Sequence, residues 1–192
     1  MIPAAAPLGV FGGSFDPPHV GHVLLAAYAL AVAPIERVIV VPTFQHPFGK
    51  DMAPYADRIA MCERAFAMLT NVSVSRIEEE LGGASFTIRT LEALRAQMPA
   101  VPFRLLIGAD VLPETPRWRE WDKVSALAPP FVIGRSGSSG TPESIEDGPA
   151  LPEISSTLVR DRYHAGASVE RLVPRAVDLY ARAQGLYGTR AP

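Results

Sequence analysis

The chain has 192 residues, of which 48% are hydrophobic, so it is long enough and apolar enough to fold around a core rather than to remain disordered. Its net charge is −2 and its isoelectric point is about 6.1, which argues against a nucleic-acid partner because proteins that bind nucleic acids usually carry a basic face. The single cysteine, Cys62, excludes an intrachain disulfide, and we expect it to be a small core residue on an apolar helix face.

We expect neither a signal peptide nor a membrane span. The first residues lack a basic region before an apolar core, and the apolar run Leu8–Phe11 is better used as a strand. The longest mainly apolar stretch, Val23–Ile35, is too short to cross a bilayer and is broken by Pro34. A cytoplasmic location is therefore the default expectation.

The most informative segment begins directly after the first apolar run and reads Gly-Gly-Ser-Phe-Asp-Pro-Pro-His-Val-Gly-His over residues 12–22. The order of strand, glycine turn and helix start predicts a phosphate site, because the unpaired N–H groups and the dipole at a helix N-terminus favour an anion. His19 and His22 are three residues apart, so both rings lie on one helix face and can aim N–H groups at one phosphate.

The other residues of this segment suit the same purpose. Gly12 and Gly13 remove side chains where the backbone turns and approaches a ligand, and Gly21 leaves room for a ligand against the first helical turn. Pro17 and Pro18 fix φ and bias the preceding residues toward extended geometry, so the loop has little conformational freedom.

Two other interpretations of the histidine pair are a metal site and a plain helix cap. The only other histidines are His46 and His164, so an obvious third metal ligand is lacking and no metal site is predicted. Eleven residues in this order disfavour an incidental cap.

Along the chain, strand-like apolar runs alternate with helical ones, which predicts an α/β fold with a parallel sheet covered by helices. The expected strands are Leu8–Phe11, Val38–Val41, Val72–Val74, Arg104–Ile107 and Phe131–Ile133. The expected helices are His19–Val32, Tyr55–Leu69, Phe86–Gln97 (capped by Ser85 or Thr87), Trp118–Ala126, Ser156–Tyr163 and Arg175–Ala183. We expect residues 1–192 to form a single domain with a C-terminal helical portion from about residue 154.

Ligands of such sheets bind beyond the carboxyl ends of the strands. The glycine turn, Gly108-Ala109-Asp110 and Gly134-Arg135 follow the first, fourth and fifth expected strands, so all three lie at that edge. Ser136–Pro152 is rich in Ser, Gly, Pro and acidic residues, and we interpret it as a mobile loop of undecided role rather than a linker.

A second chemical cluster, Ile154–Arg160, begins a helix after that loop. Ser155 and Ser156 are good N-caps, so a capped surface helix is one interpretation. The other is a second anion site, in which hydroxyls and free N–H groups meet phosphate oxygens and Arg160 supplies a fork of donors.

These segments carry a family resemblance. His19-Val20-Gly21-His22 resembles the HxGH signature of the nucleotidyltransferase superfamily, and the wider form from Gly13 resembles the nicotinate mononucleotide adenylyltransferases in particular. Ile154–Arg160 is similar to the ISSTxxR motif of the same superfamily. The resemblance extends from Gly9 to Tyr187 and implies a Rossmann-like, doubly wound parallel sheet with flanking helices.

The resemblance also implies roles for individual residues. It makes His19, His22 and Arg160 catalytic, and Asp110 a partner of the nucleotide ribose. The implied ATP-binding residues are Gly12, Gly13, Ser14, Phe15, His19, Gly21, His22, Gly108, Asp110, Ser155, Ser156, Thr157 and Arg160.

For the mononucleotide, the resemblance implies Lys50, Ser85, Thr87 and Trp118. Trp118 lies in a Pro-x-Trp segment and offers a flat π-face for the nicotinate ring, while Trp121 is the candidate for a core tryptophan.

One segment departs from the family pattern. The family has Pro-His-Lys after the second strand, whereas here His46 and Lys50 are separated by three residues. We take Lys50 as the match, with a solvated loop lysine as the alternative, and whether Lys50 or His46 contacts phosphate stays open.

The implied reaction transfers AMP from ATP to nicotinate mononucleotide, giving deamido-NAD and pyrophosphate in NAD biosynthesis by in-line attack with no covalent intermediate. Mg²⁺ would be bound mainly through the ATP phosphates. Nicotinamide mononucleotide, another acceptor such as phosphopantetheine, and a non-catalytic nucleotide-binding module are the alternatives. The family often forms dimers, so a homodimer stays open, and a dinucleotide-dependent oxidoreductase is disfavoured because the G-x-G-x-x-G spacing is missing.

Overall fold

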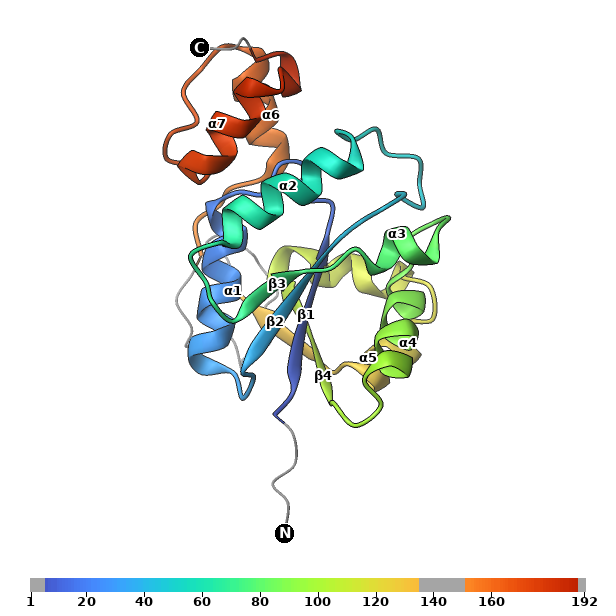
Figure 1. Ribbon diagram of the computed structural model, residues 1–192. Coiled ribbons are helices and arrows are strands. Elements are labelled where there is room, and N and C mark those ends of the chain that lie inside the picture. The colour runs from blue at the N-terminus through green and yellow to red at the C-terminus, as the bar shows by residue number, and fades with distance from the viewer. Residues whose placement is uncertain (1–5, 135–150, 190–192) are drawn as a thin grey trace.

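A computed structural model of the chain describes residues 6–134 and 151–189, and its strands form one parallel sheet in the order β3-β2-β1-β4-β5 (Figure 1). The strands are β1 (Leu8–Gly13), β2 (Arg37–Pro42), β3 (Val72–Val74), β4 (Phe103–Gly108) and β5 (Pro130–Ile133). Each expected strand is confirmed to within two residues at either end.

β1 lies at the centre of the sheet. Leu8 pairs with Arg37 of β2 on one side and with Phe103 of β4 on the other. The chain runs outward from β1 through β2 to β3, and then crosses back to β4 and β5. The order therefore reverses between β1 and β4, and in open α/β sheets ligands bind beside the loops at such a point.

Most of the expected helices are confirmed, with small differences at their ends. The α-helices are α1 (Val20–Val32), α2 (Tyr55–Phe66), α3 (Ile77–Leu81), α4 (Thr87–Gln97), α5 (Trp121–Leu127), α6 (Ser156–His164) and α7 (Arg175–Ala183). Two 3-10 helices are η1 (Ala109–Arg117) and η3 (Leu186–Gly188). The sequence did not predict α3, η1 or η3, which are too short or too tightly wound to show a 3.6-residue apolar period.

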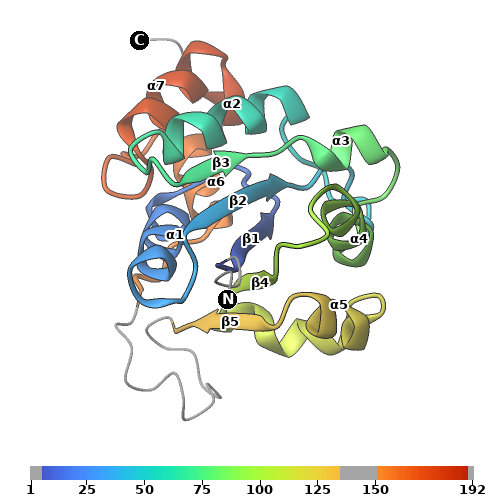
Figure 2. The same cartoon turned by 60° about the horizontal axis from the view of Figure 1, so that its bottom comes forward.

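The helices cover both faces of the sheet, which confirms the doubly wound architecture. In β4, Leu106 belongs to a core that includes residues of α1, α2, α6 and α7, while its neighbours Leu105 and Ile107 belong to a second core with α4 and α5. Figure 2 shows α1 and α4 on opposite sides of the strands. Cys62 of α2 is fully buried in the first core, as expected, and this burial raises the pKa of its thiol.

The C-terminal helices pack onto the same core as the sheet. Val159 and Tyr163 of α6 and Val177 of α7 belong to one cluster with Phe11 of β1. α7 also contacts α2, and Figure 1 shows α6 and α7 beside that helix.

The expected helix Trp118–Ala126 is wrong at its start. η1 brings the chain through Pro113 and Pro116, and Glu120 then adopts a left-handed conformation with φ of 55°. An α-helix cannot continue through that conformation, so α5 begins at Trp121 and Trp118 lies before it in extended backbone.

Two smaller expectations are also wrong. α2 ends at Phe66 rather than Leu69. The N-cap of α4 is Phe86, with no side-chain cap bond, so neither Ser85 nor Thr87 caps it.

Of the loop expected over Ser136–Pro152, residues 136–150 lie outside the described part of the chain, as does Arg135. Among the described residues, no helix combines the length and the hydropathy needed to cross a membrane.

Candidate active site

The turn that leads from β1 into α1 brings the two histidines together. His19 is the N-cap of α1, and its backbone N–H donates to Nδ1 of His22 over 3.1 Å. The two rings stack with centroids 3.6 Å apart and planes inclined by 28°. Because Nδ1 of His22 accepts a hydrogen bond, the neutral ring carries its proton on Nε2 and is a donor there.

Gly21 makes this stack possible. A Cβ added to Gly21 would lie 3.1 Å from both Cε1 and Nδ1 of His19, which is closer than ordinary carbon contacts. The ring of His19, which is only 2% exposed, packs against the position where a side chain of residue 21 would begin. Gly21 therefore leaves room for the ring of His19, and its predicted contact with a ligand stays a prediction.

The residues before the histidines divide into an open part and a buried part. Gly12 is exposed, and a Cβ there would meet nothing within 4 Å. A Cβ on Gly13 would lie 3.3 Å from the ring of Phe15, which is 1% exposed and packs edge-on against Phe11 and Phe66. Phe15 can therefore offer a ligand only its backbone, whereas Gly12 leaves its side open.

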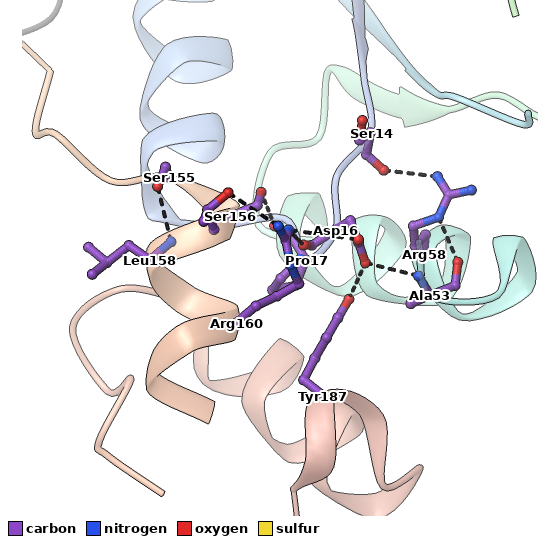
Figure 3. A network of polar contacts seen from close by, with 11 residues as sticks. Ser14, Asp16, Pro17, Ala53, Arg58, Ser155, Ser156, Leu158, Arg160 and Tyr187 are labelled. Atoms are coloured by element: carbon purple, nitrogen blue, oxygen red, sulfur yellow. Dashed lines mark hydrogen bonds and ion pairs between the residues drawn. The ribbon is translucent and has the colours of Figure 1, made fainter. Parts of the chain in front are cut away.

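The second predicted cluster meets this turn. Ser156, the first residue of α6, donates its hydroxyl to the carbonyl oxygen of Pro17 over 2.9 Å. Arg160 donates from one guanidinium nitrogen to the carbonyl oxygen of Asp16 over 2.7 Å (Figure 3). Segments 139 and 144 residues apart in the chain are thus joined at one place.

The start of α6 is organised as its sequence predicts. Ser155 is the N-cap, and its hydroxyl accepts from the N–H of Leu158 over 3.1 Å. Thr157 accepts from the second nitrogen of Arg160 over 3.2 Å. Neither α1 nor α6 carries an acidic residue in its first turn, so two positive helix ends face the same region with a guanidinium beside them.

Gly108 and Asp110 lie at the neighbouring strand end. Gly108 closes β4 and is buried, and the exposed Asp110 lies in the first turn of η1. Since β4 pairs with β1 in parallel, both residues lie at the same carboxyl edge of the sheet as the histidine turn.

Two of the residues predicted for the mononucleotide, Lys50 and Ser85, lie in or against the loop after β2. Instead of capping α4, Ser85 accepts with its hydroxyl from the N–H groups of Phe44 and Gln45, over 3.0 and 3.1 Å. Glu78 of α3 accepts from the same N–H of Phe44 over 3.0 Å and from the hydroxyl of Thr90 over 2.9 Å. Ser85 therefore orders the loop through its side chain.

The loop itself carries His46 and Lys50. His46 accepts with Nδ1 from the N–H of Phe48 over 3.3 Å, and burial, then the charge of Lys50, lowers the pKa of its ring. Lys50 is exposed, and Thr87 is half-buried in the first turn of α4.

Trp118 is half-buried and meets Trp121 edge-on, with centroids 5.7 Å apart and planes at 88°. The next residue, Arg119, lies over the ring of Phe86 at 5.0 Å, which connects the end of η1 to the start of α4. Trp118 and Thr87 are thereby brought to neighbouring elements.

Three residues that hold the histidine turn were not singled out from the sequence: Asp16, Arg58 and Tyr187. Arg58 is 1% exposed, and it shares a helix face with Met61 and Cys62, which are fully buried. A charged residue on the buried stripe of an amphipathic helix is a signal that the sequence did contain.

Comparisons with known proteins show the family and the fold of the chain. A family model described as "Cytidylyltransferase-like" matches residues 10–162. A protein of Anaeromyxobacter sp. (strain K), named "Probable nicotinate-nucleotide adenylyltransferase", is 45% identical over 183 residues, which cover 94% of this chain and 96% of that protein. A protein of Myxococcus xanthus (strain DK1622) with the same name is 39% identical over 187 residues, 97% of each chain.

Among solved structures, "Plasmodium falciparum nicotinic acid mononucleotide adenylyltransferase complexed with NaAD" has a similar fold. Its TM-score is 0.81 at 18% identity, and the match covers 97% of this chain and all of that chain.

Proposed function

We propose that this chain, which belongs to the cytidylyltransferase-like family, transfers AMP from ATP to nicotinate mononucleotide. The products are deamido-NAD and pyrophosphate, and the reaction is a step of NAD biosynthesis. The relatives at 45% and 39% identity, which this chain matches over nearly its whole length, support this acceptor. The observation that carries the proposal is the pair of hydrogen bonds from Ser156 and Arg160 to the carbonyl oxygens of Pro17 and Asp16.

These two hydrogen bonds matter because they join the anion site at the start of α1 to the one at the start of α6. The start of α1 and the start of α6 are each suited to an anion, but a single phosphate would need only one of them. Joined at the Asp16–Pro17 turn, they suit a chain of phosphates. We assign His19 and His22 to the α-phosphate, and Ser155, Ser156, Thr157 and Arg160 to the β- and γ-phosphates.

The reaction then needs little besides position and charge. A phosphate oxygen of the mononucleotide bonds to the α-phosphorus of ATP while the bond to the bridging oxygen breaks, and that oxygen leaves with pyrophosphate. The nucleophile is already an anion, so no general base is required. His19 and His22 stabilise the charge that develops at the α-phosphate, and Arg160 stabilises the leaving group.

Mg²⁺ enters as part of the MgATP substrate, on the phosphate oxygens. In the described part of the chain, no three His, Cys, Asp or Glu side chains are grouped so that they could hold a metal ion. We therefore derive no protein ligand for the ion.

For the mononucleotide, we propose that Trp118 stacks on the pyridine ring, and that Thr87, Ser85 and Lys50 lie around its ribose and phosphate. Ser85 acts mainly by ordering the loop after β2, since its hydroxyl already accepts two backbone N–H groups of that loop. Lys50 is exposed and supplies the positive charge of this group.

The test is pyrophosphate release by the purified protein with ATP and Mg²⁺. Nicotinate mononucleotide, nicotinamide mononucleotide and phosphopantetheine are compared at equal concentration, with a mock-purified sample that lacks the protein as the control for contaminating activity. We expect release with the nicotinate form and much less with the others. Preference for nicotinamide mononucleotide would refute the acceptor but keep the chemistry. Silence with all three in a folded sample that binds ATP would refute the reaction.

A further inference from the structure

The turn between β1 and α1 is held from behind by a buried carboxylate. Asp16 is 1% exposed, and its Oδ1 accepts from the hydroxyl of Tyr187 over 2.7 Å and from the N–H of Ala53 over 3.2 Å. Its other oxygen lies 3.8 Å from the guanidinium of Arg160 (Figure 3). A buried charge keeps its place only when its partners satisfy it, so these contacts determine where the turn lies.

Arg58 completes the support from the opposite side. It is 1% exposed, and it donates to the carbonyl oxygens of Ala53 and Ser14, each over 2.9 Å. The backbone of the turn is therefore fixed at Ser14 by α2 and at Asp16 by α6 and Tyr187.

Tyr187 reaches Asp16 in an unusual conformation. Its φ is +57°, in the left-handed region that non-glycine residues rarely adopt, and its ring stacks on Tyr163 with centroids 5.7 Å apart. Burial, followed by the charge of Asp16, raises the pKa of its hydroxyl, so this group stays protonated and remains a donor.

The chain offers two matched tyrosines for comparison. Tyr163 donates to Asp178 over 3.0 Å, and Tyr180 donates to Asp57 over 2.8 Å. Both bonds are of the same chemical kind and lie in the same C-terminal region as the bond of Tyr187. Neither reaches the turn between β1 and α1.

We infer that Tyr187 is a positioning residue for the triphosphate of ATP: its hydroxyl holds the carboxylate of Asp16 away from Arg160, so that the guanidinium remains available to the phosphates. This role rests on the proposed function, which assigns Arg160 to the β- and γ-phosphates. Without the hydroxyl, Asp16 loses one hydrogen bond, and the guanidinium of Arg160, 3.8 Å from its second oxygen, can replace that donor. A closer ion pair there competes with phosphate for the same cation.

The first experiment compares Tyr187→Phe with Tyr163→Phe and Tyr180→Phe. The probes are α,β-methylene-ATP, which cannot transfer AMP, and AMP, which lacks the outer phosphates; affinities are measured by calorimetry and stabilities by thermal unfolding. We expect Tyr187→Phe to bind the analogue about tenfold more weakly and AMP as the wild type does. We expect the other two variants to lose stability to a similar degree and to bind both probes normally.

An equal loss of analogue affinity in all three variants would mean that these bonds only stabilise the C-terminal region, and it would overturn the inference. So would unchanged affinity in Tyr187→Phe, or an equal loss for AMP.

A second variant tests the route through Asp16. In Asp16→Asn the amide oxygen still accepts a hydrogen bond, but the charge that attracts Arg160 is gone. We expect the double variant Asp16→Asn, Tyr187→Phe to bind the analogue more tightly than Tyr187→Phe alone. A double variant that binds no more tightly than Tyr187→Phe would overturn the inference. If Tyr187→Phe alone is too unstable to measure, a double variant that binds the analogue more weakly than Asp16→Asn alone would overturn it.

These binding measurements need no acceptor. Wild-type protein that binds the analogue but releases no pyrophosphate with any acceptor would refute the proposed reaction while leaving the role of Tyr187 measurable.

Discussion

Replacing Gly21 with alanine is expected to lower the catalytic rate by displacing His19, while leaving the stability of the fold nearly unchanged. The new methyl group would lie 3.1 Å from Cε1 and Nδ1 of His19, where ordinary carbon contacts are about 3.5–4.0 Å, so the ring must move by several tenths of an ångström. His19 is buried and stacked on His22 at 3.6 Å, and it therefore cannot move without disturbing its partner.

The magnitude follows from that displacement. A misplacement of about 1 Å can cost about a hundredfold in rate, so a shift of several tenths is expected to lower kcat/KM roughly tenfold. Alanine in place of glycine within a helix adds about 0.5–1 kcal/mol of stability, which offsets the steric cost. We expect the free energy of unfolding to stay within about 1 kcal/mol of wild type.

The assay is pyrophosphate release at several ATP concentrations, together with urea unfolding of the same sample. Leu24→Ala is the control, because Leu24 is on the same helix and 38% exposed. Gly21→Ala with wild-type turnover and equal or higher stability would refute the reasoning, since it would show that the His19 ring adjusts without consequence.

The remaining predictions concern three side chains. His22→Ala should lower turnover on the order of a hundredfold or more while the protein stays folded; unchanged turnover in the pure variant would remove His22 from the mechanism. Trp118→Ala should raise the KM for the mononucleotide far more than the KM for ATP, and equal effects on both would identify a structural partner of Trp121 instead. Cys62 is fully buried and its thiol pKa is raised, so a thiol reagent should modify it only as the protein unfolds; modification of the native protein at the rate of a free thiol would contradict the packing.

The sheet was predictable because its strands are short, nearly continuous apolar runs, such as Val38–Val41. Such a strand buries all its apolar side chains only when helices cover both faces of the sheet. The two clusters that we propose to bind phosphates could be recognised because each is a local pattern: the spacing of His19 and His22, and the serines that begin α6. What joins them was not predictable, because the contact of Ser156 with Pro17 spans 139 residues and leaves no local periodicity.

Other differences have local causes. Trp118 was expected to begin a helix, but the left-handed Glu120 and the two prolines of η1 place the helix start at Trp121. Ser85 was expected as a cap because serine is a common cap residue, and in the structure its hydroxyl accepts from the loop after β2 instead. The choice between these partners depends on tertiary packing that propensity does not describe.

The support of the turn between β1 and α1 also has a consequence for how the protein is made. During translation the turn leaves the ribosome early, whereas its partners Ser156 and Tyr187 come 139 and 171 residues later. At a translation rate of about 5–20 residues per second, these partners are synthesised roughly ten to thirty seconds after the turn. The contacts that we propose to position the triphosphate therefore cannot form until α6 and η3 have been made. In the proposed reaction, ATP binding thus depends on a part of the chain that is translated after the whole sheet is complete.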